Sequence, residues 1–205
     1  LVEGVPLGIE LAASWVRMLS CQEIVQEIEQ NVDFLATSMR DLPERHRSLR
    51  AVFDYSWTLL SAEEQGVLRR LAVFRGGFRR EAAKGLGASL PLLSALVDKS
   101  LLRRNPDGRY DMLEIVRQYA AGKLQDVPDE EVQARDWHCR FYAQFLQQRE
   151  NAIRGEQQKM TLEEIGAETE NVRAAWTWAL EQRGQDQIGQ SLECLHLFYE
   201  MRSWF

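Results

Sequence analysis

Seven arginines in the middle of the chain are the side chains best suited to recognition chemistry. A guanidinium group can hold phosphate or carboxylate oxygens through paired hydrogen bonds. The seven fall into two groups, one within residues 62–86 and one near a predicted hairpin. They are Arg69, Arg70, Arg75, Arg79 and Arg80, followed by Arg103 and Arg104. We interpret them as a basic docking surface, for which the acidic C-terminal part of the chain is one candidate partner.

Direct reading of a DNA sequence would need hydrogen-bond donors on the helix that enters the major groove. That helix is predicted at residues 90–99, and its outer side offers Ser94, Ala95, Asp98 and Lys99. It contains no Arg, Asn or Gln, and the Asp98 carboxylate would repel phosphates. We therefore do not expect this chain to bind DNA directly.

No arrangement of residues predicts catalysis. The pattern G-x-x-x-x-G-K-[S/T], whose backbone cradles nucleotide phosphates, does not occur in the 205 residues. The glycine pairs Gly76-Gly77 and Gly85-Leu86-Gly87 lack the following lysine, so they are predicted to end helices. No Ser/His/acid or Cys/His constellation stands out. The chain by itself is therefore not expected to be an enzyme.

Signals for metals, disulfides and membranes are also missing from the sequence. The cysteines are odd in number and far apart, which is typical of a reducing cytosol. The histidines show no metal-ligand spacing. These residues are Cys21, Cys139 and Cys194, and His46, His138 and His196. No run approaches the roughly 18 apolar residues of a membrane helix, so we expect a cytoplasmic location without membrane contact.

The formal net charge of −6 is unevenly distributed. Residues 1–38 carry −5, residues 39–125 carry +6 and residues 126–205 carry −7. A basic middle between acidic flanks supports a division into domains and permits electrostatic docking between them. The chain starts at Leu1 with no initiator Met and no signal pattern, so we expect it to be a fragment of a longer protein.

Residues 1–43 predict a short pair of helices. Pro6 suits the first turn of a helix over residues 5–19. Ser20 and Glu23 form a capping box that begins the second helix. Its predicted apolar face consists of Ile24, Val25 and Ile28. A pair this short buries little by itself, so we interpret it as the remnant of a larger helical subdomain.

Residues 44–125 predict the element order of a winged helix. Ser61 and Glu64 form a second capping box, and Ser89 with Pro91 begins another helix. A winged helix can read DNA, bind protein or form a rigid block inside a larger switch.

The wing itself is predicted from turn chemistry. Asn105-Pro106-Asp107-Gly108 joins two brief strand-like runs at residues 101–104 and 109–112. Asp111 is the expected cap of the closing helix that follows.

Residues 126–205 predict helices only, after a linker at 126–131. Three apolar stripes recur at helical spacing. They are Trp137, Phe141 and Phe145; Val172, Ala175, Trp176 and Ala179; and Ile188, Leu192, Leu195 and Tyr199. Paired helices with such stripes predict the start of a helical-repeat array, and the apolar residues 201–205 suggest that the array continues.

Three stretches together resemble one family, the NB-ARC-type STAND ATPases. GVPLGIELAA, residues 4–13, is similar to the G-L-P-L motif that follows their nucleotide-binding core. Residues 47–78 and 96–120 resemble the winged-helix block of bacterial members, many of which are antibiotic-regulatory or LuxR-like transcription regulators. The part from Trp137 onward is similar to the tetratricopeptide-like repeats that follow this block. The implied fold is mainly α, with a small β-hairpin wing.

The resemblance implies a switch. In this family the nucleotide domain, which this sequence lacks, holds ADP together with the helical subdomain and winged helix. A protein or small-molecule inducer at the repeats lets ATP replace ADP. Pro6 matches the proline that packs near adenine. Met112, Leu113 and Glu114 match an M-H-D motif that supplies a His to the phosphates, although Leu113 cannot donate a hydrogen bond and Glu114 can serve as a helix cap.

Pro6, Leu113 and Glu114 are thus the nucleotide-proximal candidates. No cofactor is expected in this chain alone, whereas ADP or ATP is expected in the complete protein. Two other hypotheses remain open at this stage. One is a winged-helix DNA-binding transcription factor with a helical dimerisation tail, and the other is a scaffold that binds a protein through the helical array.

Overall fold

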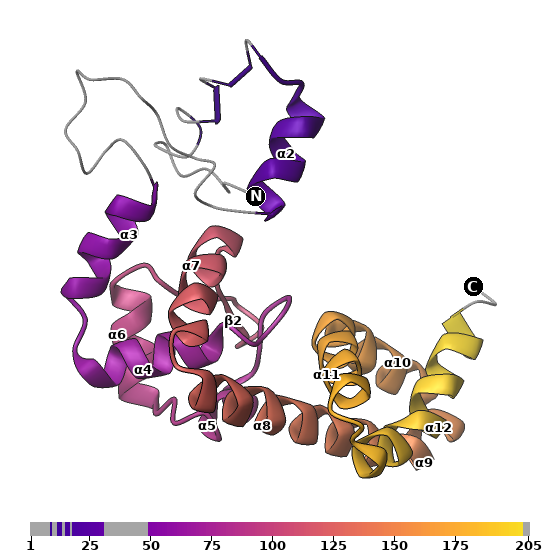
Figure 1. The fold of residues 1–205 in the computed structure, drawn as a ribbon. Helices are drawn as coiled ribbons and strands as arrows, with labels where there is room; N and C mark the ends of the chain where they lie inside the picture. The colour runs from indigo at the N-terminus through magenta and orange to yellow at the C-terminus, as the bar shows by residue number, and fades with distance from the viewer. Residues whose placement is uncertain (1–8, 10–11, 14, 17, 31–48, 203–205) are drawn as a thin grey trace, which may run out of the picture. The chain divides into compact units, whose positions relative to one another are not determined.

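The computed structural model describes residues 9, 12–13, 15–16, 18–30 and 49–202, which are mainly helical (Figure 1). The described helices are α2 (Cys21–Gln30), α3 (Leu49–Thr58), α4 (Ala62–Leu71), α5 (Arg80–Lys84), α6 (Leu90–Asp98), α7 (Glu114–Gln125), α8 (Pro128–Gln147), α9 (Glu150–Arg154), α10 (Gln158–Ala167), α11 (Thr169–Glu181) and α12 (Gln185–Arg202). The described strands are β1 (Arg103–Arg104) and β2 (Tyr110–Asp111). This composition confirms the predicted mainly α fold with a small hairpin.

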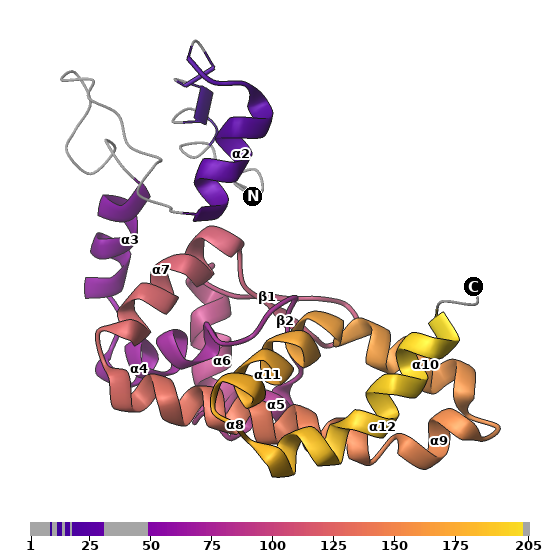
Figure 2. The same cartoon turned by 45° about the vertical axis from the view of Figure 1, so that its right-hand side comes forward.

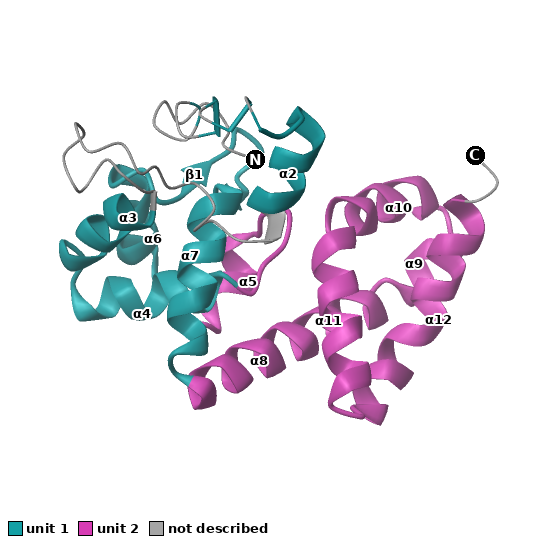
Figure 3. Ribbon diagram, turned by 45° about the horizontal axis from the view of Figure 1, so that its top comes forward, with its two compact units in different colours: residues 1–72, 88–127 teal, residues 73–87, 128–205 magenta. Residues whose placement is uncertain are grey.

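The chain divides into two compact units (Figure 3). The first unit comprises residues 1–72 and 88–127, and the second comprises residues 73–87 and 128–205. The segment Val73–Gly87, called here the α4–α6 segment, lies in sequence between two helices of the first unit. It is nevertheless part of the second unit, which otherwise begins at α8.

Part of the N-terminal prediction falls on described residues. The predicted helix over residues 5–19 is helical at residues 9, 12 and 13, whereas residues 15, 16 and 18 form turns. The capping box before α2 is confirmed, because the Ser20 N–H donates to Glu23 Oε2 at 2.8 Å and the Glu23 N–H donates to Ser20 Oγ at 3.3 Å. On α2 the side chains of Ile24 and Ile28 are buried, but that of Val25 is exposed. Pro6 and residues 31–48 lie outside the described residues.

The second predicted capping box begins α4. The Ser61 N–H donates to Glu64 Oε2 at 2.7 Å, and the Glu64 N–H donates back to Ser61 Oγ at 3.2 Å. Glu64 also accepts a 2.6 Å hydrogen bond from Lys99 Nζ at the end of α6. The Lys99 hydrogen bond, with the bonds from Ser61, lowers the pKa of the Glu64 carboxyl. One carboxylate thus starts α4 and joins it to α6.

The core of the first unit forms where α4 packs against α6 and α7. Its side chains come from apolar positions at helical spacing, as the sequence pattern predicts. The most completely buried are Val67, Leu68, Leu71, Leu93, Leu96, Leu102, Ile115 and Ala120. Burying one such Leu or Ile side chain contributes about 1.5–3 kcal/mol.

The wing is present, with strands of two residues each rather than four. Arg103 pairs with Asp111 and Arg104 with Tyr110 in an antiparallel register. Gly108 takes φ +83°, a left-handed conformation that the turn requires and that glycine adopts without strain.

The cap predicted for α7 was wrong. The helix begins at Glu114, and its N-cap residue, Leu113, makes no side-chain capping bond. The Asp111 carboxylate instead accepts a 2.9 Å hydrogen bond from the Met112 N–H. The Asp111 side chain is therefore used inside the hairpin, too early in the chain to cap the helix.

In the second unit, α8 packs against both α11 and α12 (Figures 1 and 2). The linker predicted at 126–131 is shorter than expected, because Pro128 fits the first turn of α8. The stripe on α11 is confirmed at Val172, Ala175 and Ala179, which are buried.

Two predicted stripes are displaced by about one residue. On α8 the large buried side chains are His138, Tyr142 and Leu146, whereas Trp137, Phe141 and Phe145 are half-buried. On α12 the buried side chains are Ser191, Cys194 and Phe198. Both helices carry apolar residues on adjacent faces, so spacing alone could not decide which face turns inward.

The Ser61 cap can be tested by mutation. Ser61→Ala removes a hydrogen-bond acceptor from the first turn of α4 and should lower the free energy of unfolding by about 1 kcal/mol. Ser94→Ala, at an exposed position of α6, is the matched control and should change it by less than about 0.5 kcal/mol. Urea denaturation measures both, and equal effects would contradict the assigned cap.

Candidate functional site

Of the nucleotide-proximal candidates, the structure describes Leu113 and Glu114. The Glu114 carboxylate accepts hydrogen bonds from Arg117 Nε at 2.7 Å and Nη2 at 2.5 Å, and from Gln118 Nε2 at 3.2 Å. Arg117 is buried, and its Nη1 also donates to the Ala72 carbonyl at 3.5 Å. Glu114 therefore orients Arg117 towards the end of α4, and it lies in the first turn of α7, where a carboxylate is favourable. Leu113 is half-buried at the start of α7.

The seven arginines are shared between the two units. Arg69 and Arg70 are half-buried on α4, and Arg103 and Arg104 are exposed on β1, all in the first unit. Arg75, Arg79 and Arg80 are exposed on the α4–α6 segment in the second unit. A docking surface on either unit alone would thus carry three or four of them.

A site that the sequence analysis did not single out lies around Asn171, which is fully buried on α11. Asn171 Oδ1 accepts a hydrogen bond from the Arg75 N–H at 2.7 Å, and Nδ2 donates to the Gly77 carbonyl at 2.7 Å. Gly76 and Gly77 have φ values of +71° and +82°, a left-handed conformation that glycine adopts without strain. One side-chain amide thus supplies both bonds and fixes the start of the α4–α6 segment to α11.

Aromatic rings surround this amide. The Phe74 ring stacks on Phe78 with centroids 4.5 Å apart and meets the His138 ring edge-on at 5.2 Å. The His138 and Tyr142 rings lie 4.8 Å apart. We call Phe74, His138, Tyr142, Glu168 and Asn171 the Asn171 cluster; each of them is buried.

Hydrogen bonds link the polar side chains of this cluster. Glu168 Oε2 accepts from Asn171 Nδ2 and from the Tyr142 hydroxyl, each at 2.9 Å. His138 Nε2 lies 3.3 Å from Asn171 Oδ1, which the Nε2-protonated neutral ring can approach as a donor. A buried network of this kind stabilises one arrangement only when all of its members are paired.

Burial also sets the charge of His138. Desolvation lowers the pKa of its imidazole to about 4, although the hydrogen bond to Asn171 opposes the shift. The ring is therefore neutral in the folded protein at neutral pH, whereas the unfolded chain takes up a proton near pH 6.5. Because of this difference in pKa, His138 lowers the free energy of unfolding as the pH falls from about 6.5 towards about 4.

Trp137 makes a second attachment to the α4–α6 segment. Its indole Nε1–H donates to the Ala82 carbonyl at 3.1 Å. A Cβ atom added to Gly85 would lie 2.0 Å from the indole ring, closer than any real contact. Gly85 therefore ends α5 and at the same time admits the indole against the backbone.

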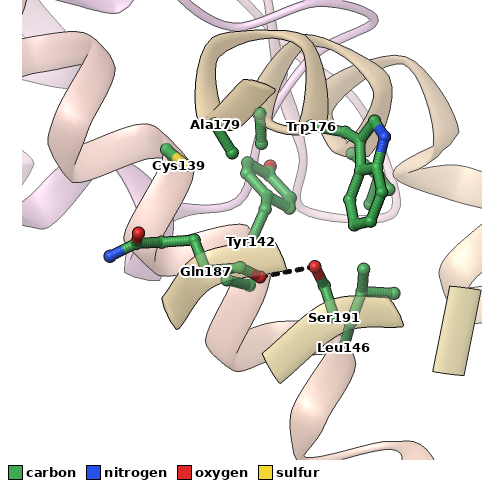
Figure 4. Close-up of a pocket in the computed structure, with 10 residues that line it drawn as sticks. Cys139, Tyr142, Leu146, Trp176, Ala179, Gln187 and Ser191 are labelled. Carbon is green, nitrogen blue, oxygen red and sulfur yellow. Dashed lines mark hydrogen bonds between the residues drawn. The ribbon is translucent and has the colours of Figure 1, made fainter. Parts of the chain in front are cut away.

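A small pocket lies deeper in the second unit, between α8, α11 and α12 (Figure 4). Its lining includes Cys139, Tyr142, Trp176 and Ser191, and the Ser191 hydroxyl donates to the Gln187 carbonyl at 2.6 Å. The space holds about one water molecule. Pockets for small organic ligands are far larger, so this pocket does not accommodate an inducer in the present conformation.

Within the described ranges, no set of three His, Cys, Asp or Glu side chains is arranged to hold a metal ion. Among the helices described, none combines the length and the apolar character needed to span a membrane.

Comparison with known proteins gives relatives that are longer than this chain. Two proteins named "Putative HTH-type transcriptional regulator", from Mycobacterium bovis and Mycobacterium tuberculosis, are each 35% identical over an alignment that covers the whole chain and 24% of the relative. An uncharacterised protein of Mycobacterium tuberculosis is 36% identical over 61% of this chain and 35% of its own length.

The chain thus spans about a quarter of the length of the regulators it matches. No protein-family model matches it. No solved structure matches it either.

The sequence does contain a signal for Asn171. The residue stands four positions before Ala175 and eight before Ala179, so it lies on the apolar stripe predicted for α11. A polar side chain in a buried stripe requires a hydrogen-bond partner. The sequence could not reveal that partner, which lies 94 to 96 positions earlier in the chain.

Replacement of Asn171 should be costly. Asn171→Ala removes the bonds to the part-buried Arg75 N–H and the buried Gly77 carbonyl, so we expect a loss of about 2–4 kcal/mol in the free energy of unfolding. Asn151→Ala, at an exposed position of α9, is the control and should change it by less than about 0.5 kcal/mol. Calorimetry or urea denaturation would show the difference, and a neutral Asn171→Ala variant would contradict the network.

The Gly85 contact gives a second test. Gly85→Ala should lower the free energy of unfolding by about 1–3 kcal/mol, because the new methyl group displaces the Trp137 indole. A shift in tryptophan fluorescence should accompany this loss of stability, because the indole changes its surroundings. Gly189→Ala on α12 is the matched control; its Cβ meets nothing within 4 Å, and it should stabilise by about 0.5–1 kcal/mol. A stabilising Gly85→Ala variant would exclude the close approach.

Proposed function

We propose that this chain is the regulatory part of a multidomain STAND-type signalling ATPase or transcription regulator. In this proposal it couples the adenine-nucleotide state of a neighbouring domain to the sensing of a ligand or protein by helical repeats. The resemblance of residues 4–13, 47–78 and 96–120 to that family supports it. So does the similarity of the whole chain to mycobacterial proteins named as HTH-type transcriptional regulators.

The observation that carries the proposal is the membership of the α4–α6 segment in the second unit. Coupling between a winged helix and a repeat array needs a physical connection with a defined arrangement. If a flexible linker between α7 and α8 were the only connection, it would transmit little of any displacement from one unit to the other. A segment of the winged-helix sequence that is bonded to α8 and α11 would supply such a connection.

ADP or ATP would be bound in the complete protein, by the nucleotide domain together with Pro6 and the region near Leu113. Glu114 would act indirectly, because its carboxylate is engaged by Arg117. The inducer, a protein or small molecule, would bind at the helical repeats in the cytoplasm. Arginines of the basic surface would dock the nucleotide domain or an acidic repeat surface.

Direct DNA reading by α6 has less support. Its exposed polar positions are Ser94, Asp98 and the C-cap residue Lys99, and the Lys99 ammonium is committed to Glu64 at 2.6 Å. That leaves few donors for base edges.

The proposal predicts bound ADP. A longer protein that carries this chain and the preceding domain, purified natively and then denatured, should release a stoichiometric amount of ADP. Pro6→Ala should reduce the amount retained, whereas Pro43→Ala, outside the matched motif, should not. Chromatography of the released nucleotide measures both. Absence of nucleotide, together with absence of a phosphate-binding loop upstream, would contradict the proposal.

A further inference from the structure

We propose that Asn171 is a positioning residue that fixes the C-terminal end of α4 and the N-terminal end of α6. Both helices belong to the first unit, whereas Asn171 belongs to the second. It would do so by holding the α4–α6 segment through the backbone of Arg75 and Gly77. This conformational device lies within the present chain, and it does not depend on whether the complete protein binds a nucleotide.

The connections at the two ends of the segment are short. Helix α4 ends at Leu71, and the α4–α6 segment begins at Val73, so only Ala72 lies between them. At the other end, only Ala88 and Ser89 separate Gly87 from the first residue of α6. An extended residue spans at most about 3.6 Å. Connections of one and two residues therefore have little slack with which to absorb a movement of the segment.

The connecting residues are also packed and bonded. Ala72 and Ala88 are buried, with 3% and 1% of their surfaces exposed. The Ala72 N–H donates to the Arg69 carbonyl at 3.2 Å, and the Leu93 N–H donates to the Ser89 carbonyl at 2.9 Å. A displacement of the segment would consequently disturb the last turn of α4 and the first turn of α6 before any other part of the first unit.

The Asn171 amide fits only one position of the segment. It bonds two backbone groups of the segment and one carboxylate of its own unit, at 2.7, 2.7 and 2.9 Å. If the segment moved away, the Arg75 N–H and the Gly77 carbonyl would lose this partner together, whereas the bond between Asn171 and Glu168 would remain. The loss of two bonds at once favours a sharp transition between held and released states over a gradual one.

The Asn171 amide binds the backbone of the segment. Its bonds do not depend on the Arg75 side chain, which is exposed, or on a side chain at Gly77. Trp137 on α8 contacts the other end of the segment, at Ala82 and Gly85. The start of the segment is therefore bonded to α11 and its end to α8.

Hydrogen–deuterium exchange of individual amides tests the proposal on the chain itself. Asn171→Ala should accelerate exchange at Arg75 and, by about tenfold or more, at Ala72 and Leu93, because those turns lose their fixed neighbour. Exchange at Ala120, in the middle of α7, should stay at the wild-type rate. The control Asn151→Ala should leave all four amides unchanged.

A residue that merely stabilised its own unit would not move the Ala72 and Leu93 amides. Acceleration confined to Arg75 and α11, or uniform acceleration that includes Ala120, would therefore overturn the proposal. Should Asn171→Ala fail to fold, Gly77→Ala strains the segment from its own side, at φ +82°, with Asn171 intact. It should give the same pattern of faster exchange at Ala72 and Leu93 with Ala120 unchanged, and any other pattern would overturn the proposal.

Discussion

The arrangement of this protein depends on one buried amide group. Asn171 must pair all of its polar atoms, and it finds its partners on the backbone of a segment almost a hundred residues earlier in the chain. Leaving such a group unpaired in an apolar surrounding costs more than the bonds themselves contribute. The α4–α6 segment is therefore drawn into the second unit, and the boundary between the units does not follow the order of the sequence.

The rest of the second unit is consistent with that constraint. The neutral His138 ring, the Tyr142 hydroxyl and the Glu168 carboxylate complete the polar network, and the buried Phe74 ring packs between His138 and Phe78. Gly85 lacks the side chain that would keep the Trp137 indole from the backbone. Positive φ values at Gly76 and Gly77 turn the chain so that its backbone groups face Asn171. In each case the residue type is explained by a contact with another part of the second unit.

Local chemistry made much of the fold predictable. Capping boxes at Ser20 and Ser61 and the turn at Gly108 depend on neighbours within a few residues, and all three are found where the sequence predicts them. Stripes on α8 and α12 were displaced, because the choice between adjacent apolar faces is made by helices distant in sequence. The Asn171 cluster was missed for the same reason: its position on an apolar stripe was visible, but its partners were not.

We infer that the α4–α6 segment shares its stability with α11 and not with α7. Ile165→Ala, at a fully buried position of α10, should destabilise the second unit by about 2–5 kcal/mol. Native-state hydrogen exchange of that variant should show the amides of Ala83 and Leu86 accelerating by the same factor as that of Val172, with Ala120 unchanged. If Ala83 and Leu86 kept their wild-type rates while Val172 accelerated, the segment would belong with the winged helix and the account would be contradicted.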